Sequence, residues 1–367
     1  MKIGITGGDG FIGQHLRFFL LPLEKEGAVE VCLFPKHSFA DGTLETLLAD
    51  CDAIVHLAGK NRGEDSEMYD TNLSLARTLI EACDAATVRP HIVFASSLHR
   101  ERDSAYGRSK RDAERLFVEW GVRTGAPVAI MILPHVFGPF CKPFYNSAVA
   151  TLCHELAEGV DSTINDGAQV ELLHAHDVAR AFYESIVEKT EGEIILSGTH
   201  MSLADVYAFL AQAYEQYQSN VIPKLSSTIE QQLFGTLQVY VFDKQFPRVL
   251  NVKDDPRGPI FEIIRGNGSG QVFFSTTHSG KTRGNHYHTR KFERFCVVQG
   301  DGEIAIRKLF DTKVKRFPVS GSEPTVVDMP QFYAHNITNV GDCDLLVAFW
   351  ISEHYNESDP DTYYETV

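Results

Sequence analysis

The sequence predicts an α/β fold in which a doubly wound parallel sheet is followed by an all-β domain. Two observations carry this prediction. Up to about residue 135, short apolar runs alternate with longer helical patterns, and such alternation builds a parallel sheet with helices on both faces. Beyond about residue 250, short strand-like runs separated by Gly, Asn, Asp and Pro continue to the last residue, which is typical of an antiparallel barrel or sandwich.

Length, charge and cysteine usage narrow the class of protein. A chain of 367 residues exceeds the usual size of one hydrophobic core, so we expect two domains, 1–245 and 250–367. No run is long and apolar enough to span a bilayer, and the first residues resemble a strand and loop rather than a signal peptide, so we expect a cytoplasmic protein. Seven cysteines without a C-x-x-C pair indicate reduced thiols. A net charge of −15 argues against nucleic acid or a membrane as partner, while a local basic pocket can still hold a small anion.

A glycine-rich turn follows the first predicted strand, residues 2–6. Gly7, Gly10 and Gly13 let the backbone approach a pyrophosphate, whose charge is favoured by the free N–H groups at the start of the next helix. A tight turn that simply requires glycine is the alternative, and the order of strand, turn and helix favours the dinucleotide. We therefore predict a dinucleotide-binding loop that also includes Phe11 and Ile12.

The second predicted strand, residues 29–34, indicates which dinucleotide is bound. It ends without the Asp or Glu that would bind the 2′-hydroxyl of NAD, and Lys36 and His37 follow it. These side chains suit a 2′-phosphate, although a surface lysine is often only solvated. NADPH is therefore the expected cofactor.

Further strands are predicted over 52–59, 91–97 and 128–133, with a helix over 106–120. The first of these strands ends in Leu57, Ala58 and Gly59, where the cofactor would cross the sheet. Ligands of such folds bind at the carboxyl ends of the strands, so these residues are candidate cofactor contacts.

Three polar residues suggest acid–base chemistry. Tyr106 and Lys110 stand four apart on the predicted helix and share a face, and Ser97 ends the strand before it. A neighbouring ammonium favours the phenolate form of a tyrosine, whose pKa is ordinarily about 10. Such a set can donate a proton to a carbonyl while hydride arrives from a nicotinamide. A solvent-facing Tyr and Lys at a helix start is the alternative.

Together these motifs resemble the extended short-chain dehydrogenase/reductases that act on nucleotide sugars. The resemblance covers residues 1 to about 245 and rests on Thr6-Gly7-x-x-Gly10-x-x-Gly13, His56-Leu57-Ala58-Gly59, Ser97, and Tyr106 with Lys110. It implies a Rossmann-type sheet, Tyr106 as proton donor, Lys110 as its pKa partner and ribose ligand, and Ser97 as the hydroxyl that holds the substrate oxygen. Pro134 resembles the residue beside the nicotinamide. The interval from Ser97 to Tyr106 is shorter than is usual in the family.

Between residues 141 and 240 the alternation loosens, which suits a smaller substrate-capping region. Asn146 and His174 are polar candidates there, and buried structural roles are the favoured interpretation for both. The stretch 214–232 is interpreted as a solvated surface.

Two histidines separated by one residue suggest a metal site in the second domain. His286 and His288 lie on one face if the segment is a strand, Glu293 follows five residues later, and His335 lies on a later strand-like run. These residue types suit Zn²⁺, Ni²⁺, Fe²⁺ or Mn²⁺, with zinc as the preferred candidate. A structural metal is the alternative to a catalytic one.

The same residues resemble the first motif of the cupins, small jelly-roll barrels that hold a divalent metal. Every fixed position of G-x5-H-x-H-x4-E-x6-G is matched, by Gly280, His286, His288, Glu293 and Gly300. The second motif matches at Pro330, His335 and Asn339. Phe332 stands where glycine is usual, so we expect the turn before His335 to be shaped differently.

A second resemblance overlaps this one. Segments 255–262 and 283–287 are similar to those of deoxyhexose-nucleotide 3,5-epimerases, in which arginines contact the nucleotide diphosphate and a histidine takes a proton alpha to a 4-keto group. That histidine position is His286, which the cupin pattern assigns to the metal. We favour the ligand role, with the metal polarising the ketone. The base is then open between Tyr287, Lys291 and a metal-bound hydroxide.

The order of the two domains resembles the bifunctional CapF/WbjC-type enzymes of capsule and O-antigen synthesis. That resemblance implies epimerisation at C3 of a UDP-2-acetamido-2,6-dideoxy-4-hexulose, a UDP-linked 4-keto deoxyamino sugar, and reduction of its C4 ketone with NADPH. The product would be a UDP-2-acetamido-2,6-dideoxy-L-talose sugar, a precursor of UDP-N-acetyl-L-fucosamine. A homodimer is expected because similar epimerases commonly pair through their barrels. The alternatives are an NAD-dependent 4-epimerase or dehydratase, and a non-enzymatic NADP sensor with a cupin ligand domain.

Overall fold

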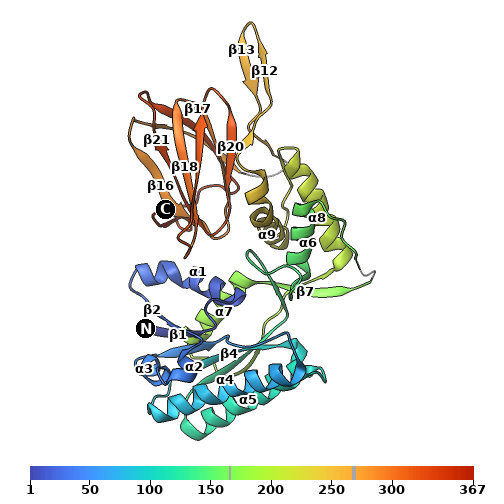
Figure 1. The fold of residues 1–367 in the computed structure, drawn as a ribbon, viewed down its shortest axis with the longest axis vertical. Helices are drawn as coiled ribbons and strands as arrows, with labels where there is room; N and C mark the ends of the chain where they lie inside the picture. The colour runs from blue at the N-terminus through green and yellow to red at the C-terminus, as the bar shows by residue number, and fades with distance from the viewer. Residues whose placement is uncertain (165–166, 267–269) are drawn as a thin grey trace. The chain divides into compact units, whose positions relative to one another are not determined.

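The computed structural model describes residues 1–164, 167–266 and 270–367 (Figure 1). Packing divides the chain into two compact units: residues 1–137 with 169–201 form the first, and residues 138–168 with 202–367 form the second. Among the described helices, none is both long and apolar enough to cross a membrane.

A six-stranded parallel sheet forms the centre of the first unit. The spatial order of its strands is β2-β1-β3-β4-β5-β8, and every neighbouring pair runs parallel. The strands are β1 (Lys2–Thr6), β2 (Glu30–Phe34), β3 (Ala53–His56), β4 (His91–Ser97), β5 (Val128–Leu133) and β8 (Gly192–Ile195). β3 and β5 are buried along their whole length, which is why they read as continuous apolar runs rather than alternating ones.

Helices cover both faces of this sheet, as Figure 1 shows. On one face, α3 (Leu44–Leu48), α4 (Asp65–Ala85) and α5 (Ala105–Thr124) build a core around Phe117 and Trp120. On the other, α1 (Phe11–Lys25) and α7 (Ala175–Glu188) build a second core that includes Phe182. The predicted doubly wound sheet is confirmed, and the short elements α2 (Ser38–Asp41) and η1 (Leu98–Glu101) complete it.

A three-stranded sheet adjoins the end of β5, in the order β6-β7-β9. Its strands are β6 (His135–Phe137), β7 (Gln169–His174) and β9 (Thr199–Ser202). His174 is buried and caps α7, where its Nδ1 accepts a hydrogen bond of 3.4 Å from the His176 amide, so it has the expected structural role. Asn146 is exposed, and the expected buried role is wrong for it.

Two five-stranded antiparallel sheets dominate the second unit. The first has the order β11-β20-β17-β22-β15, with β11 (Arg248–Val249), β20 (Thr325–Met329), β17 (Glu293–Gln299), β22 (Leu345–Ile351) and β15 (Gln271–Thr277). The second has the order β19-β18-β21-β16-β23, with β19 (Val314–Ser320), β18 (Asp301–Lys308), β21 (Tyr333–Asn339), β16 (Thr282–Tyr287) and β23 (Tyr363–Tyr364). The antiparallel all-β character predicted beyond residue 250 is thus confirmed.

Three helices also belong to the second unit: α6 (Ala148–Glu158), α8 (Leu203–Gln218) and α9 (Thr228–Gln245). α9 packs against the strands through Phe234, whose ring lies 5.5 Å from that of Phe292, and through Phe242, whose ring lies 5.6 Å from that of Tyr333. The expected boundary at residues 245–250 coincides with the end of α9, whereas packing places α9 with the strands that follow it.

A buried charge network holds the end of α8 on the β-sheets. Arg294 donates to both carboxylate oxygens of Asp328, at 2.6 and 2.9 Å, and Tyr217 donates to the same carboxylate. All three side chains are almost fully buried, and Arg294 also donates to Asn220. The interpretation of 214–232 as a solvated surface is therefore wrong at Tyr217, because that side chain pairs with residues more than seventy positions away that the local pattern does not reveal.

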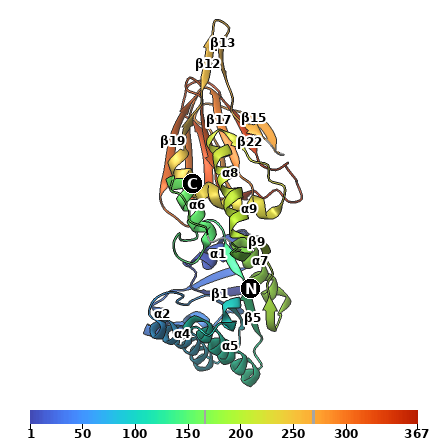
Figure 2. The ribbon, with the colours of Figure 1, turned by 90° about the vertical axis from the view of Figure 1, so that its right-hand side faces the viewer.

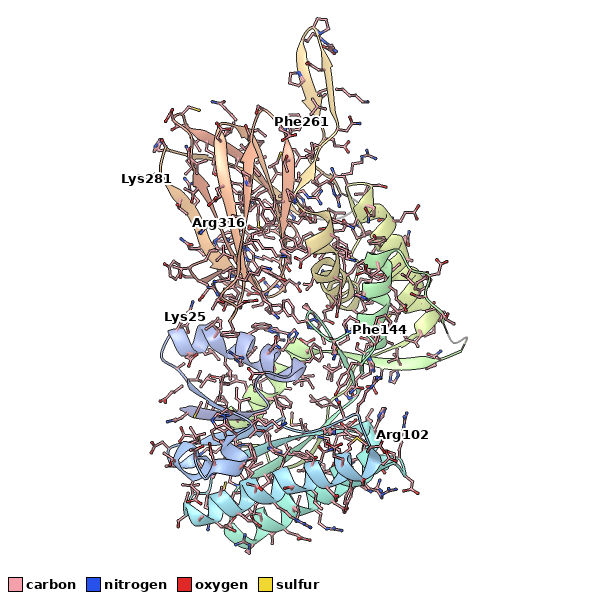
Figure 3. All side chains as sticks on the ribbon, viewed as in Figure 1. Lys25, Arg102, Phe144, Phe261, Lys281 and Arg316 are labelled. Atoms are coloured by element: carbon pink, nitrogen blue, oxygen red, sulfur yellow. The ribbon has the colours of Figure 1, made fainter. Side chains whose placement is uncertain are left out.

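A two-stranded hairpin, β12 (Val252–Asp255) and β13 (Gly258–Phe261), extends beyond the two sheets of its unit, as Figures 1 and 2 show. Phe261, labelled in Figure 3, marks the point where β13 returns to the body of the unit. The remaining pair is parallel, β10 (Val221–Ile222) with β14 (Arg265–Gly266).

Candidate functional site

The glycine turn after β1 is shaped by close backbone contacts. Gly7 has a φ of 69°, and a Cβ atom there would lie 2.8 Å from the amide nitrogen of Ala58. A Cβ at Gly13 would lie 2.3 Å from the carbonyl oxygen of Gly7. Gly10 precedes the first residue of α1 as its N-cap. Only glycine fits at positions 7 and 13, and the turn delivers the free N–H groups of α1 to the end of the sheet.

The hydroxyl group of Thr6 ties this turn to the next strand. It accepts hydrogen bonds of 3.1 Å from the backbone amides of Leu57 and Ala58, and it lies 2.9 Å from Nδ1 of His56. The segment after β3 is therefore fixed beside the glycine turn, as a dinucleotide crossing the sheet would require.

All the predicted cofactor residues follow the carboxyl ends of strands in one parallel sheet. Thr6 pairs in register with Phe34 on one side and with His56 on the other, so the three strand ends are level. The residues gathered at this edge are Gly7, Gly10, Phe11, Ile12, Gly13, Lys36, His37, Leu57, Ala58, Gly59 and Pro134. Lys36 and His37 are exposed there, and no acidic residue ends β2.

Ser97, Tyr106 and Lys110 come together at the same edge. Ser97 is the last residue of β4, and Tyr106 lies in the first turn of α5, near enough to Ser97 for that side chain to lower its pKa. The Lys110 ammonium donates to the backbone carbonyl of Ala95 at 2.8 Å and lies 5.8 Å from the centre of the Tyr106 ring. The structure thus brings the three predicted residues into one group.

Burial displaces the pKa values of these groups in opposite directions. It raises the pKa of Tyr106 to about 12, against a smaller lowering by the hydrogen bond to Ser97. It lowers the pKa of Lys110 to about 8, against a smaller raising by Glu114. The sequence suggested a tyrosine pKa lowered by the lysine, whereas desolvation of the phenolate raises it here.

Two polar side chains in the first unit, Glu114 and Asn72, were not predicted as part of the site. Glu114 is 8% exposed, accepts a hydrogen bond of 2.9 Å from Arg100, and also accepts one from Ser96. Asn72 holds the backbone of Lys60 through bonds of 2.6 and 2.9 Å. Glu114 stands four residues after Lys110, so the spacing along α5 was a signal that could have identified it.

The four predicted metal ligands converge in the second unit. One ligand atom each from His286, His288, Glu293 and His335 lies within 4.8 Å of the others. Oε2 of Glu293 is 3.1 Å from Nε2 of His335, 3.4 Å from Nε2 of His288 and 3.7 Å from Nε2 of His286. His286 and His335 are cross-strand partners in one sheet, and Glu293 begins β17 in the other. Both sheets therefore contribute to the cluster.

The hydrogen bonds made by the Nδ1 atoms of the histidines indicate whether their Nε2 atoms are available to a metal ion. Nδ1 of His335 lies 3.1 Å from the carbonyl oxygen of Tyr333, and Nδ1 of His288 lies 2.5 Å from that of Asp361. A carbonyl can only accept, so both rings carry a proton on Nδ1 and turn the lone pair of Nε2 toward Glu293. Nε2 of His288 is buried and has no hydrogen-bond partner among the residues that the structure describes. This donor set fits a divalent ion such as zinc.

The charges of the cluster also suit a cation. Burial raises the pKa of the Glu293 carboxyl group, but the surrounding histidines outweigh this and hold it well below its usual value. Burial lowers the pKa of His335 to about 4, which keeps this ring neutral. An ionised carboxylate beside a neutral imidazole is the state in which both bind metal.

Phe332 was expected to change the turn before His335. It has a φ of 63°, the left-handed conformation that glycine adopts without strain, and its side chain is fully buried. Its amide donates to the carbonyl oxygen of His288 at 2.8 Å. Phenylalanine therefore takes a glycine-like backbone here and adds a buried ring, and the expected difference in the turn stays a prediction.

Two of the residues considered as the epimerisation base point elsewhere. Tyr287 lies between two ligands on β16, and its buried ring packs 5.3 Å from that of Tyr363. Lys291 is 1% exposed and donates to the carbonyl oxygen of Pro360 at 2.8 Å. Neither side chain is directed at the cluster.

The arginines of the epimerase-like segments are separated. Arg283 lies on β16, three residues before His286, and donates to Oγ1 of Thr277 at 3.1 Å. Arg257 lies at the turn of the β12–β13 hairpin and pairs with Asp255 at 2.6 Å. Of these two arginines, Arg283 shares a strand with His286 and Arg257 does not.

Comparison with known proteins matches both parts of the chain. Residues 3–198 match the model of the NAD dependent epimerase/dehydratase family, and residues 253–363 match that of the polysaccharide biosynthesis C-terminal domain. The chain is 33% identical over 368 residues to UDP-2-acetamido-2,6-beta-L-arabino-hexul-4-ose reductase of Pseudomonas aeruginosa, covering 99% of this chain and 98% of that protein.

Solved structures agree with this result. The crystal structure of the capsular polysaccharide assembling protein CapF from Staphylococcus aureus has a TM-score of 0.60 and 31% identity, with 100% of both chains covered. RMD from Pseudomonas aeruginosa, solved with NADPH, has a TM-score of 0.55 and 18% identity over 65% of this chain and 97% of that one. The latter likeness concerns the fold alone.

Proposed function

Since the chain belongs to the NAD dependent epimerase/dehydratase family, we propose that it is a nucleotide-sugar enzyme of capsular polysaccharide biosynthesis that reduces a 4-keto sugar with NADPH. The observation that carries this proposal is the grouping of Ser97, Tyr106 and Lys110 at the edge of the sheet where the predicted cofactor residues lie. Lys36 and His37, at the end of a strand without an acidic residue, support NADPH rather than NADH.

The substrate we propose is a UDP-2-acetamido-2,6-dideoxy-4-hexulose, and the chain acts on it twice. The configuration at C3 is inverted first, and the ketone at C4 is then reduced to a hydroxyl group. The ketone acidifies the C3 proton, so its reduction fixes the inverted configuration. The product is a UDP-2-acetamido-2,6-dideoxy-L-talose sugar, a precursor of UDP-N-acetyl-L-fucosamine. Full-length similarity to the Pseudomonas aeruginosa reductase supports this assignment.

Three residues of this chain would supply the proton that the reduction needs and stabilise the group that has lost it. NADPH supplies the hydride to C4 when it is bound. The Tyr106 hydroxyl donates a proton to the C4 oxygen, and the neighbouring Ser97 hydroxyl holds the same oxygen. The Lys110 ammonium favours the phenolate that remains. A pKa of about 12 keeps Tyr106 protonated at neutral pH, as a proton donor must be.

For the epimerisation we propose a metal-binding cupin domain within residues 250–367, separate from the NADPH-binding residues within 1–245. His286, His288, Glu293 and His335 would hold a divalent ion, zinc being preferred. The ion would polarise the ketone and so make the C3 proton more acidic. The position of His286 in the cluster supports its role as a ligand rather than as the base.

A homodimer completes the proposal. β15 is the last strand of its five-stranded sheet, and it exposes Val272, Phe273 and Phe274 by 56, 40 and 66%. An apolar strand at a sheet edge is a surface that pairs readily with another chain. These observations support association of two copies through their C-terminal units.

The reductase assignment is tested with purified full-length protein and a 4-keto UDP-sugar. Tyr106→Phe removes the proton donor and should lower the rate of NADPH oxidation by about 10²- to 10⁴-fold while NADPH still binds. Tyr183→Phe is a matched control, since that ring packs 5.6 Å from Phe19 on α1. Unchanged turnover in Tyr106→Phe would show that the reductase assignment is wrong.

The epimerase assignment is tested separately, with NADPH omitted. Solvent deuterium should enter the sugar at C3, and either chelation or His288→Ala should stop the exchange because the ketone is no longer polarised. His278→Ala is the matched control, since that exposed histidine pairs with Asp344 at 2.8 Å outside the cluster. Exchange that survives both treatments would make the metal structural.

A further inference from the structure

A buried carboxylate lies against the turn that follows His288. Asp361 is 1% exposed, whereas residues 354–359 before it are all exposed. Its φ of 41° lies in the left-handed region that L-residues rarely adopt, although Asp tolerates it better than most. The chain therefore enters the body of the unit at Asp361, in a conformation that the surrounding contacts must hold.

The Asp361 carboxylate accepts four hydrogen bonds from three consecutive residues. Oδ1 accepts from the amide and the hydroxyl group of Thr289, at 3.0 and 2.6 Å. Oδ2 accepts from the amides of Arg290 and Lys291, at 3.0 and 2.9 Å. Backbone amides that converge on one buried carboxylate fix the path of the chain between them. The segment directly after His288 is thus held in place by Asp361.

The backbone of the same residue contacts His288 itself. The carbonyl oxygen of Asp361 accepts a hydrogen bond of 2.5 Å from Nδ1 of His288. This bond selects the tautomer with the proton on Nδ1 and leaves the lone pair on Nε2, 3.4 Å from Oε2 of Glu293. Asp361 therefore contacts both the ring of this ligand and the backbone of the residues that follow it.

Neighbouring residues reinforce these contacts. Tyr363 and Tyr364 form β23, and Tyr364 pairs in register with His286 on β16. The carbonyl oxygen of Pro360 accepts from the buried Lys291 ammonium at 2.8 Å. Residues 359–364, which we call the C-terminal clamp, thus contact the strand that carries one histidine and the turn that carries the other.

From this geometry, and resting on the metal-dependent function proposed above, we propose that Asp361 is a positioning residue of the metal centre. It holds His288 in the tautomer and ring orientation that bind an ion. The ring is ordered by folding rather than by metal binding, so the affinity for the ion is higher than a freely rotating histidine would give.

The experiment measures the zinc affinity of the metal-free full-length protein by competition with a chromophoric chelator. Asp361→Ala should weaken zinc binding by about 10- to 100-fold, the usual effect of losing a group that orients a ligand. Thr362→Ala is the matched control, because its hydroxyl group donates to Pro360 at 3.0 Å within the clamp without contacting His288. Its zinc affinity should equal that of the unaltered protein.

Asp361→Asn is a second variant that tolerates the positive φ but turns an amide donor toward the three backbone amides. It should also weaken zinc binding, and it keeps the test decisive if Asp361→Ala does not fold. In either folded variant, the nitrogen NMR signals of His288 without metal should change from one tautomer to a mixture of two.

A double-mutant cycle separates positioning from general stability. In a His288→Ala background, Asp361→Ala should change zinc affinity by less than about twofold, because its target is gone. A lower melting temperature with unchanged zinc affinity, or an equal loss in both backgrounds, would overturn the role of Asp361. If His288→Ala alone leaves zinc affinity unchanged, the metal centre itself is wrong, and that failure is recognised without any Asp361 variant.

Discussion

Tyr106 and Lys110 lie beside each other, each half-buried, and burial shifts their pKa values in opposite directions. The tyrosine, with a pKa raised to about 12, keeps its proton throughout the neutral range. The lysine, with a pKa lowered to about 8, changes its charge close to neutral pH. The ionisation that limits the proposed reduction at alkaline pH is therefore that of Lys110.

This difference predicts a pH dependence for the reductase. The folded protein loses the Lys110 charge as the pH rises through about 8, whereas the unfolded chain holds it to about 10.5. Between these values the unfolded chain binds more protons, so this residue makes the fold more stable as the pH rises. The rate should depend on pH in the opposite direction to the stability. Above about pH 8, kcat/KM should fall because the Lys110 ammonium loses its charge.

The measurement is kcat/KM for NADPH oxidation across that range. In Lys110→Arg the guanidinium group remains charged, so the descending limb should move to higher pH. If kcat/KM falls at the same pH in both proteins, the ionisation that causes the fall belongs to a residue other than Lys110.

Local spacing predicted both groups of site residues because each group contains a pair of residues close together in the sequence. Tyr106 and Lys110 share a helix, whereas His286 lies on β16 and His288 follows the last residue of that strand. Asp361 was missed because it contacts His288 across 73 positions and nothing near it in the sequence marks a partner. The pKa of Tyr106 was predicted in the wrong direction because sequence reveals neighbours but not the extent of desolvation.

At the scale of elements, the parallel strands were predicted well, and α9 was not. β1, β4 and β5 have the predicted bounds, since each is a buried apolar run flanked by turn residues. α9 buries residues on nearly every side, including Leu233, Phe234 and Thr236, so its pattern has no clear polar face. A helix of this kind gives no sign of which neighbour it packs against.

The packing of α9 predicts a large effect on stability. The Phe234 ring is fully buried and lies 5.3 Å from that of Tyr217 and 5.5 Å from that of Phe292. Phe234→Ala should lower the free energy of unfolding by about 3–5 kcal/mol because it leaves a cavity between α8, α9 and the sheets. Urea denaturation measures this.

Tyr355→Ala serves as the comparison, since it removes an aromatic ring that is 61% exposed in the same unit. Its effect should stay within about 0.5 kcal/mol. Equal losses in the two variants would mean that α9 is not part of this core.

At the scale of the whole chain, the two units are not two successive stretches of sequence. Residues 138–168 pack with the second unit, although residues 169–201, which follow them, pack with the first. Sequence reasoning places a boundary where the character of the elements changes, at 245–250. It cannot detect that helices before that point have their partners after it, because helices of either unit look alike in sequence.

Fragments of the second unit test this division. A fragment of residues 202–367 should unfold cooperatively and at a higher temperature than one of residues 250–367. The shorter fragment loses α8 and α9, and with them the bonds of Arg294 to Asn220 and of Tyr217 to Asp328. Both fragments lack α6, so the difference between their melting temperatures, measured by circular dichroism, reports the contribution of α8 and α9. Equal melting temperatures would show that the antiparallel sheets fold independently of α8 and α9.

The early position of α6 in the sequence has a consequence for folding during synthesis. This helix packs against α9, and the hydroxyl group of Tyr240 on α9 bonds to the carbonyl of Cys141, 99 residues earlier. At about 5–20 residues per second, a ribosome needs roughly 5 to 20 seconds to make that interval. The side of α6 that packs against α9 therefore stays without that contact for as long as the interval takes to make.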